Sequence, residues 1–426
     1  MESGCTSAPR DGAHNLFNLL AANHNYFEGI TVRNTNVAFL IGWKSIGGSS
    51  GFTLKNSLLY DVGRGVQDEW AGSQDLYIAD NVILGRHLPE RMTSWNRENV
   101  WAKWRAFPAP TTSEYAVKVY GQGHVVAHNY VANFHDAVTI ATYGVPSTEP
   151  ELQASSIDIY GNDMFNHADN CVELDGGVHN VRAFDNRCFN AAVWGYSTQP
   201  IFGGPAYLYR NIMYNGPGTG ALKLLDNPAG VLVYQNTFFG PAGSLGPLSN
   251  VHFRNNLIVS DGWSAPLFDV RTFTNYSSSD YNGFGPSPGV ERNFGWRSPE
   301  FGVPADYEKP LVTRAYATLP EYQQSTKQDA HSIIVGLADF VNVPAVNPAD
   351  PRILYLPENV DLRLNWGSKA VDGGIPLPGI NDGYAGRAPD LGAIELGRPM
   401  PQYGPRKWPV GSPPTTARSE VGPPRK

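Results

Sequence analysis

The chain has 426 residues, of which only 17% are charged, and its formal net charge is −7. A general nucleic-acid binder would be basic, so this charge argues against that class of protein. No run of about 18 apolar residues occurs, so we expect no membrane span.

The composition is that of a turn-rich β protein, with 45 glycines, 34 prolines and 50 aromatic residues (21 Tyr, 19 Phe and 10 Trp). The three cysteines, Cys5, Cys171 and Cys188, give no disulfide framework, and Cys171 and Cys188 could form a disulfide or stay a reduced, packed pair. No signal peptide precedes the first strand-like sequence. We expect an extracellular or periplasmic protein whose signal peptide has been removed.

A short unit recurs from about residue 30 onwards: alternating apolar residues, a polar pair and an asparagine. It ends in turn at Asn34, Asn56, Asn81, Asn129, Asn162, Asn186, Asn211, Asn236 and Asn256. Most repeats are 20 to 25 residues apart, which favours a solenoid whose coils stack about 4.8 Å apart. Asparagine at a fixed place can bond the next coil's backbone and tolerates left-handed turns, so we interpret this column as structural.

Over about residues 25–290 this repeat resembles the right-handed parallel β-helix family, which has the pectate-lyase-like fold. The resemblance implies an all-β, right-handed parallel β-helix solenoid, which we assign to residues 1–290 with an insertion loop at 86–113. Members of that family mostly act on polysaccharides, so the resemblance also implies a polysaccharide partner.

The pattern changes after about residue 290. The stretch TLPEYQQSTKQDAHS (318–332) predicts one amphipathic helix. Residues 361–397 resemble the closing segment of bacterial β-helix proteins, and we expect the acidic residues Asp372, Asp390 and Glu395 to tie its turns together. We therefore assign 291–397 to a helix-containing connection and a C-terminal cap of the solenoid. The Pro-rich residues 398–426 are predicted to be an extended or disordered tail.

Alternation within the strands identifies side chains that point away from the core. Four segments with apolar flanks align on consecutive coils, and their central residues form an outward column of Lys118, Thr139, Glu173 and Lys223, with residues 194–198 filling one coil and Gln67 extending it upstream. Lys118 and Lys223 each lie two coils from Glu173, about 10 Å away. That spacing suits a sugar ring better than an ion pair.

A second column of carboxylates follows the repeat. Asp136 and Asp169 each come seven residues after a repeat asparagine, so we expect them about 5 Å apart on adjacent coils. Charges that close should raise one pKa or share a cation such as calcium. Asp175 faces the same way as Glu173. Because charged residues are scarce in this chain, we interpret the strip as a site rather than a solvated face, with Asp169, Glu173 and Asp175 as a candidate calcium site.

Two loops could wall this strip. The insertion holds Trp95, Arg97, Trp101 and Trp104, whose rings and guanidinium suit sugars and carboxylates. The second loop, 194–207, offers Tyr196.

The first hypothesis is β-elimination of a uronate-containing polysaccharide. Lys118 is the candidate base, activated by burial or by Lys or Arg neighbours, and Arg97 or Arg182 could meet the sugar carboxylate. Lys223 is a further catalytic candidate because it shares the column. The stretch from Glu114 to Lys118 loosely resembles a strand of the alginate lyase and chondroitinase B family. The later Arg-His-Gly element of that family is missing, since TIATYG stands there.

The second hypothesis is glycoside hydrolysis by paired carboxylates from the set Asp136, Asp169 and Glu173. Polygalacturonase-type enzymes of this fold add a histidine, and His135, His167 and His179 are candidates, although their DD and GHG runs are absent. The third hypothesis is a non-catalytic, polysaccharide-binding or adhesive solenoid. We rank elimination slightly ahead of hydrolysis and expect a monomer.

Overall fold

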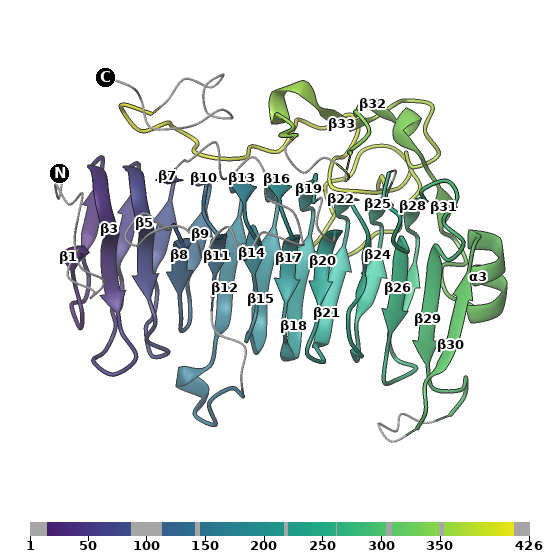
Figure 1. Ribbon diagram of the computed structural model, residues 1–426, viewed down its shortest axis with the longest axis horizontal. Helices are drawn as coiled ribbons and strands as arrows, with labels where there is room; N and C mark the ends of the chain where they lie inside the picture. The colour runs from purple at the N-terminus through teal and green to yellow at the C-terminus, as the bar shows by residue number, and fades with distance from the viewer. Residues whose placement is uncertain are drawn as a thin grey trace.

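The computed structural model describes residues 15–86, 113–140, 145–216, 220–260, 262–303, 309–347, 349 and 353–412. Over these residues the chain winds as a parallel β-helix, seen from the side in Figure 1. Successive coils stack through parallel strand pairs, which confirms the predicted all-β solenoid. None of the helices in these ranges is long and apolar enough to cross a membrane.

Each coil supplies strands to three faces, met in the order face 1, face 2 and face 3. Face 1 is a ten-stranded parallel sheet. Its strands are β2 (Tyr26–Glu28), β4 (Thr53–Lys55), β6 (Tyr77–Ala79), β9 (Val125–Ala127), β12 (Ser155–Tyr160), β15 (His179–Phe184), β18 (Phe202–Tyr209), β21 (Ala229–Tyr234), β24 (His252–Arg254) and β27 (Ser278–Asp280).

Faces 2 and 3 belong to one 18-stranded sheet, because the long strands β3 (Thr31–Gly42) and β5 (Leu58–Asp68) run along both and β5 pairs with a strand of each. Face 2 continues as β7 (Val82–Gly85), β10 (Tyr130–Ala132), β13 (Asp163–His167), β16 (Arg187–Ala191), β19 (Ile212–Tyr214), β22 (Thr237–Phe239), β25 (Leu257–Val259), β28 (Gly283–Gly285) and β31 (Ile333–Ile334). Face 3 starts at β1 (Asn15–Asn18) and continues as β8 (Tyr115–Val119), β11 (Asp136–Thr139), β14 (Val172–Glu173), β17 (Trp194–Thr198), β20 (Gly220–Leu224) and β23 (Ala242–Ser244).

Two further parallel strands, β26 (Phe268–Arg271) and β29 (Phe294–Ser298), extend face 3, since the Ala242 N–H donates to the Leu267 carbonyl just before β26. The antiparallel strand β30 (Val312–Tyr316) then ends the stack. The remaining elements are β32 (Phe340–Asn342), β33 (Asp361–Leu364), and the 3-10 helices η1 (Pro150–Leu152), η2 (Leu337–Asp339) and η3 (Pro357–Asn359).

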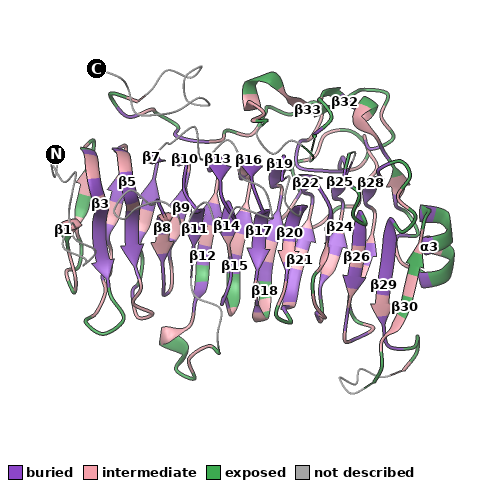
Figure 2. Ribbon diagram, in the orientation of Figure 1, coloured by how far each residue is buried: buried purple, intermediate pink, exposed green. Residues whose placement is uncertain are grey.

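Alternating side chains fill the interior of the coils. Val117, Val138, Val172 and Leu222 come from the predicted apolar flanks of face 3, and each is 0% exposed. Figure 2 shows long buried stretches in the strands of the stack, whereas strands such as β12 and β15 alternate between buried and more exposed positions. Apolar burial of this kind stabilises the fold by about 25 cal/mol per Å², and here it is spread evenly along the solenoid axis.

A buried asparagine ladder runs between faces 1 and 2. Its members bond one another from coil to coil, Nδ2 to Oδ1, at 2.9 to 3.1 Å. They are Asn81, Asn129, Asn162, Asn186, Asn211, Asn236, Asn256 and Asn282. The structural interpretation is confirmed, because each Nδ2 before Asn282 also donates to a backbone carbonyl of the preceding coil.

Two details of the predicted column were wrong. Asn34 and Asn56 are not in the ladder, since the backbone N–H of Ser57 donates to Asn81 Oδ1 and Ser57 holds the equivalent place. The left-handed turn is made by the residue before the ladder asparagine, as at Asp185, whose φ is +51°. The asparagine itself is thus free to point inward and bond both neighbouring coils.

The predicted helix over 318–332 is shorter than expected. The helix α3 (Leu319–Thr326) ends where Lys327 adopts a left-handed φ of +60°. Leu319 and Tyr322 pack into the interior, so α3 closes the C-terminal end of the stack (Figure 1). Coils also continue past residue 290, because β31 pairs with β28.

The segment 361–397 lies against the side of the coils rather than on their end. The Gly392 N–H donates to the Asn255 carbonyl at 2.7 Å. Its acidic residues tie turns as predicted: Asp372 accepts from the Arg387 N–H at 2.7 Å, and Asp390 from the Asp372 N–H at 2.8 Å.

The Pro-rich tail is extended as far as residue 412, but it is not disordered there. It runs back over the coils toward the N-terminal end (Figure 1). The Arg406 backbone N–H and side-chain Nε both donate to Asp80 Oδ1 at 2.9 Å. The Gly404 N–H donates to the Gly161 carbonyl at 2.8 Å.

Cys171 and Cys188 form a disulfide, which decides between the two alternatives left open by the sequence. Both residues are 0% exposed, and the bond joins two neighbouring coils between faces 2 and 3. It therefore reinforces the stack at the turn that carries Asp169.

We predict that Asn186→Ala lowers the free energy of unfolding by about 2–4 kcal/mol, because it removes four hydrogen bonds and takes from the buried Asn162 N–H its acceptor. Urea denaturation measures this. Asn342→Ala, at an exposed position, is the matched control and should change stability by less than about 0.5 kcal/mol. Equal effects in the two variants would contradict the role of the ladder.

We predict that the double variant Cys171→Ala/Cys188→Ala is less stable by about 3 kcal/mol, since the disulfide closes a loop of 17 residues. Thermal unfolding with and without reductant measures it. Reductant present during unfolding should lower the melting temperature of the wild-type protein and leave that of the double variant unchanged. An unchanged melting temperature of the wild type would mean that the bond does not form.

Candidate functional site

The outward column on face 3 has the predicted register. Successive pairings join its members one coil at a time: Gln67, Lys118, Thr139, Glu173, Ser197 and Lys223. Glu173 is two coils from Lys118 and two from Lys223, or about 10 Å of stacking in each direction. Ser197 is the column member from residues 194–198. It lies between Glu173 and Lys223 in the column.

The carboxylates come from the corner between faces 2 and 3. This corner spans 133–135 in one coil and 168–171 in the next, one residue longer. The Asp169 N–H donates to the His135 carbonyl, whereas the Ala137 N–H donates to the Asn170 carbonyl. Asn170 is therefore the extra residue of the longer turn, and Asp136 and Asp169 lie on adjacent coils as predicted.

Asn170 links two carboxyl groups of the site. Its Nδ2 donates to Glu173 Oε1 at 2.8 Å and to Asp136 Oδ1 at 3.3 Å. Because both oxygens bond one nitrogen, they are at most about 6 Å apart, close to the roughly 5–5.5 Å that separates the paired carboxyl groups of retaining glycosidases. The backbone N–H of Asn170 also donates to Asp136 Oδ1, at 3.0 Å. The bulge in the turn thus brings Asp136 and Glu173 within reach of one sugar ring.

The two linked carboxyl groups have pKa values displaced in opposite directions. Burial raises the pKa of Glu173 well above its usual value, and the charges of the neighbouring aspartates raise it further. Burial acts the same way on Asp136, but the adjacent His135 charge, with its 2.7 Å hydrogen bond to Oδ2, holds the pKa of Asp136 below its usual value. These opposite shifts favour the protonated form of Glu173 and the ionised form of Asp136.

Two more buried carboxyl groups complete the cluster. Burial, aided by the charge of Asp136, raises the pKa of Asp169 to about 6. Burial raises the pKa of Asp175 to about 7, although Lys223, the Ser197 hydroxyl and the Gln199 N–H all favour its charged form. Like-charge repulsion between Asp136 and Asp169 was predicted from their spacing, and burial adds the larger effect.

Several polar atoms of the cluster are buried without a hydrogen-bond partner among the described residues. They are Asp169 Oδ1, Asp175 Oδ2 and Asn170 Oδ1. Folded proteins rarely leave such atoms unpaired, so unpaired groups gathered in one place indicate a site for a ligand or ordered water. Lys223 faces the same cluster: burial lowers its pKa, but the four carboxyl groups outweigh this and raise it.

Lys118 has different neighbours from those expected. Its Nζ lies 3.1 Å from Glu69 Oε1 and 4.3 Å from the centre of the Tyr115 ring. The other oxygen of Glu69 lies 3.8 Å from Lys44 Nζ, so a carboxylate stands between Lys118 and this basic neighbour and offsets its effect. Lys118 remains on the predicted face and in the predicted coil, but its surroundings do not favour a basic role.

Three predicted substrate-binding residues are elsewhere. Tyr196 is in the core, 0% exposed, because it is in register with inward-facing Val172 and Leu222. His179 and Arg182 are on face 1, since the chain turns a corner after Asp175, and both Nε and Nη2 of Arg182 bond the Asp158 carboxylate at 2.6 Å.

The four insertion residues Trp95, Arg97, Trp101 and Trp104 lie outside the described residues. Arg86 and Ser113 flank that insertion and touch, the Arg86 N–H donating to Ser113 Oγ at 2.8 Å, so its two ends meet at the same corner as the carboxylates.

The predicted calcium set Asp169, Glu173 and Asp175 remains a prediction. No group of three or more His, Cys, Asp or Glu side chains in the described ranges is arranged to hold a metal ion. The Thr139 hydroxyl donates to Glu173 Oε2 at 2.7 Å, and Lys223 supplies positive charge to the cluster.

Sequence reasoning missed Asn170 and Glu69. A signal for Asn170 exists, because the apolar strand starts nine residues after Asn129 but ten after Asn162. Glu69 follows Gln67 by two, so alternation places it on the same side.

We predict that stability falls as pH rises from about 4 to about 7. A carboxyl group whose pKa is raised on folding holds its proton more tightly in the folded state, so stability is lost between 3.8 and the raised values of about 6 and 7 for Asp169 and Asp175. Asp175→Asn should make this fall smaller, measured as the melting temperature across pH. The exposed Glu151→Gln is the control; an equally steep fall in Asp175→Asn would contradict the burial of its charge.

Comparison of the chain with protein-family models and with curated protein sequences finds no match to either. The function proposed below therefore rests on the geometry of the site.

Proposed function

We propose that the protein is a carbohydrate-active enzyme that hydrolyses a polysaccharide with retention of configuration. The observation that carries the proposal is the pair Glu173 and Asp136, whose carboxyl oxygens are held within about 6 Å by one amide and whose pKa values are displaced in opposite directions. Paired titratable groups whose pKa values are driven apart are the arrangement that general acid–base chemistry needs.

In this mechanism Glu173 donates its proton to the glycosidic oxygen while the bond to the anomeric carbon breaks. Asp136 attacks that carbon and forms a glycosyl ester. Glu173, now ionised, takes a proton from water, and the resulting hydroxide cleaves the ester and restores Asp136. His135 orients Asp136 through Oδ2 and stabilises its negative charge between turnovers.

A polymer is favoured over a small sugar because the polar column of face 3 extends over six coils. Its rise of about 4.8 Å per coil is close to the length of one sugar unit. A linear chain lying along the column would present successive units to successive coils, with the bond to be cut beside Glu173. The resemblance of the repeat to polysaccharide-active β-helix proteins supports the same substrate class.

A second candidate is β-elimination of a uronate polysaccharide, the hypothesis ranked first from sequence. It is favoured by the placement of Lys118 and Lys223 two coils on either side of Glu173, where they could meet sugar carboxylates. We rank it second because Lys118 is paired with Glu69 and because the ionised aspartates at the centre would repel a uronate.

An extracellular or periplasmic location agrees with the buried disulfide, since such bonds persist in oxidising compartments. This location remains a proposal.

We predict that Glu173→Gln and Asp136→Asn each lower kcat between about 100- and 10,000-fold, because the first removes the general acid–base and the second removes the nucleophile. Reducing ends released from neutral, amino and uronate polysaccharides measure turnover, and proton NMR of the first product shows whether configuration is retained. Asp158→Asn on face 1 is the matched control and should keep full activity. Full activity in both site variants, or inverted product, would contradict the assignment.

The same assay separates the two chemistries. Elimination creates an unsaturated sugar with ultraviolet absorbance, which hydrolysis does not. We expect reducing ends without absorbance, and no effect of a chelator. Absorbance growth lost in Lys118→Ala but kept in Asp136→Asn would establish elimination instead, and activity abolished by the chelator would restore the calcium hypothesis.

A further inference from the structure

The corner between faces 2 and 3 widens near the C-terminal end of the stack. Two residues form this corner between β16 and β17, and two between β22 and β23. Eight residues form it between β25 and β26 (260–267), and eight again between β28 and β29 (286–293). Two long turns on consecutive coils therefore lie beside each other, at the same corner that carries Asp136 and Asp169.

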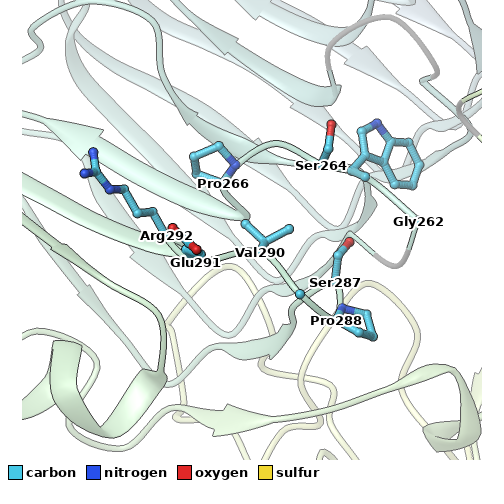
Figure 3. A pocket seen from close by; sticks show the side chains of 10 residues that line it. Gly262, Ser264, Pro266, Ser287, Pro288, Val290, Glu291 and Arg292 are labelled. Atoms are coloured by element: carbon cyan, nitrogen blue, oxygen red, sulfur yellow. The ribbon is translucent and has the colours of Figure 1, made fainter.

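A cavity of about 740 Å³ lies between these two turns. Figure 3 shows Ser264 and Pro266 on one turn across from Val290, Ser287 and Pro288 on the other, with Glu291 and Arg292 toward one end. Ser264, Glu291 and Arg292 are exposed to solvent. The cavity is thus open to solvent at its rim.

Trp263 also lines this cavity and carries an unsatisfied donor. Its side chain packs in the cluster on face 2 and the residue is 6% exposed, yet its indole N–H is buried without a hydrogen-bond partner among the described residues. A buried donor with no acceptor costs about 1–3 kcal/mol. Because this N–H is shielded from solvent, an acceptor on a bound molecule would reach it only after the indole turned toward the cavity.

The lining matches a saccharide better than other small ligands. Proline and tryptophan offer apolar surfaces for the C–H face of a sugar ring, and hydroxyl and charged side chains can bond its hydroxyl groups. Glu291 and Arg292 are adjacent and of opposite sign, so the described lining residues carry no net charge that would select an anion or a cation. The hydroxyl groups of a neutral sugar ring can donate to Glu291 and accept from Arg292.

The cavity is aligned with the proposed catalytic pair. Along face 3, β14, which carries Glu173, is followed by β17, β20, β23, β26 and β29. The two turns therefore lie four and five coils from Glu173, roughly 20 Å along the stack. A polysaccharide lying on face 3 would reach them with the sugar about four units from the bond that is cut.

We propose that this cavity is a remote saccharide-binding subsite that holds the polysaccharide about four units from the catalytic pair. The proposal rests on the proposed function for its place in catalysis, but saccharide binding to the cavity can be measured without turnover.

The direct test uses Glu173→Gln protein, whose turnover is expected to be slowed at least about 100-fold, and a panel of neutral, amino and uronate hexasaccharides, with titration calorimetry as the readout. Ser264→Phe fills the cavity from an exposed position and should weaken binding of the preferred hexasaccharide about tenfold or more. Trp263→Phe keeps the packing and removes only the N–H, and should weaken it by a smaller factor. Lys309→Ala, exposed and outside the cavity, is the matched control.

Activity distinguishes the two proposals. With active protein, Ser264→Phe should raise KM for the hexasaccharide and leave hydrolysis of a trisaccharide, too short to reach the cavity, unchanged. Hydrolysis with equal KM in Ser264→Phe and wild type would overturn the subsite and leave the proposed function standing. Hexasaccharide binding lost in Ser264→Phe, without hydrolysis of any polysaccharide, would keep the subsite and overturn the function. No hexasaccharide binding at all, or binding unaffected by Ser264→Phe, would overturn the subsite.

Discussion

Hydrogen bonds between neighbouring coils hold this protein together, and the buried asparagine ladder keeps them in register. Each ladder side chain bonds the backbone of the coil before it and the side chain of the coil after it, so a slip of one residue would break bonds on both sides. Because side chains alternate along a strand, such a slip would also turn Glu173 and Lys223 into the core. The position of every functional side chain on face 3 therefore depends on the ladder between faces 1 and 2.

The carboxyl cluster is the costly part of this architecture. Charged groups are placed where burial disfavours them, and several of their oxygens have no partner in the described ranges. The fold compensates locally: His135 stabilises the charge of Asp136, Lys223 faces the other carboxyl groups, and the raised pKa of Glu173 favours its neutral form. Stable proteins rarely hold such an arrangement without a use for it, and strongly displaced pKa values in one cluster are typical of functional sites.

The carboxyl cluster and the remote cavity both arise from longer turns at the corner between faces 2 and 3. A single extra residue in 168–171 inserts Asn170, which links Asp136 and Glu173. Turns of eight residues on two later coils open the space lined by Trp263. The strands on either side stay in register because the extra residues bulge outward from the stack. The length of the corner can therefore vary while the core of the coils stays the same.

The sequence alone determined the solenoid and the outward column of Lys118, Thr139, Glu173 and Lys223, because a repeated period and strict alternation are local properties that survive stacking. It could also place Asp136 beside Asp169, since both are counted from the same repeat. Only the tertiary structure decided what surrounds each side chain: the pairing of Lys118 with Glu69, the turning of Tyr196 into the core, the placement of Arg182 on face 1 and the path of 398–412 along the coils. Those outcomes depend on where the chain turns a corner and on contacts between residues far apart in the sequence, and a repeat pattern carries no information about either.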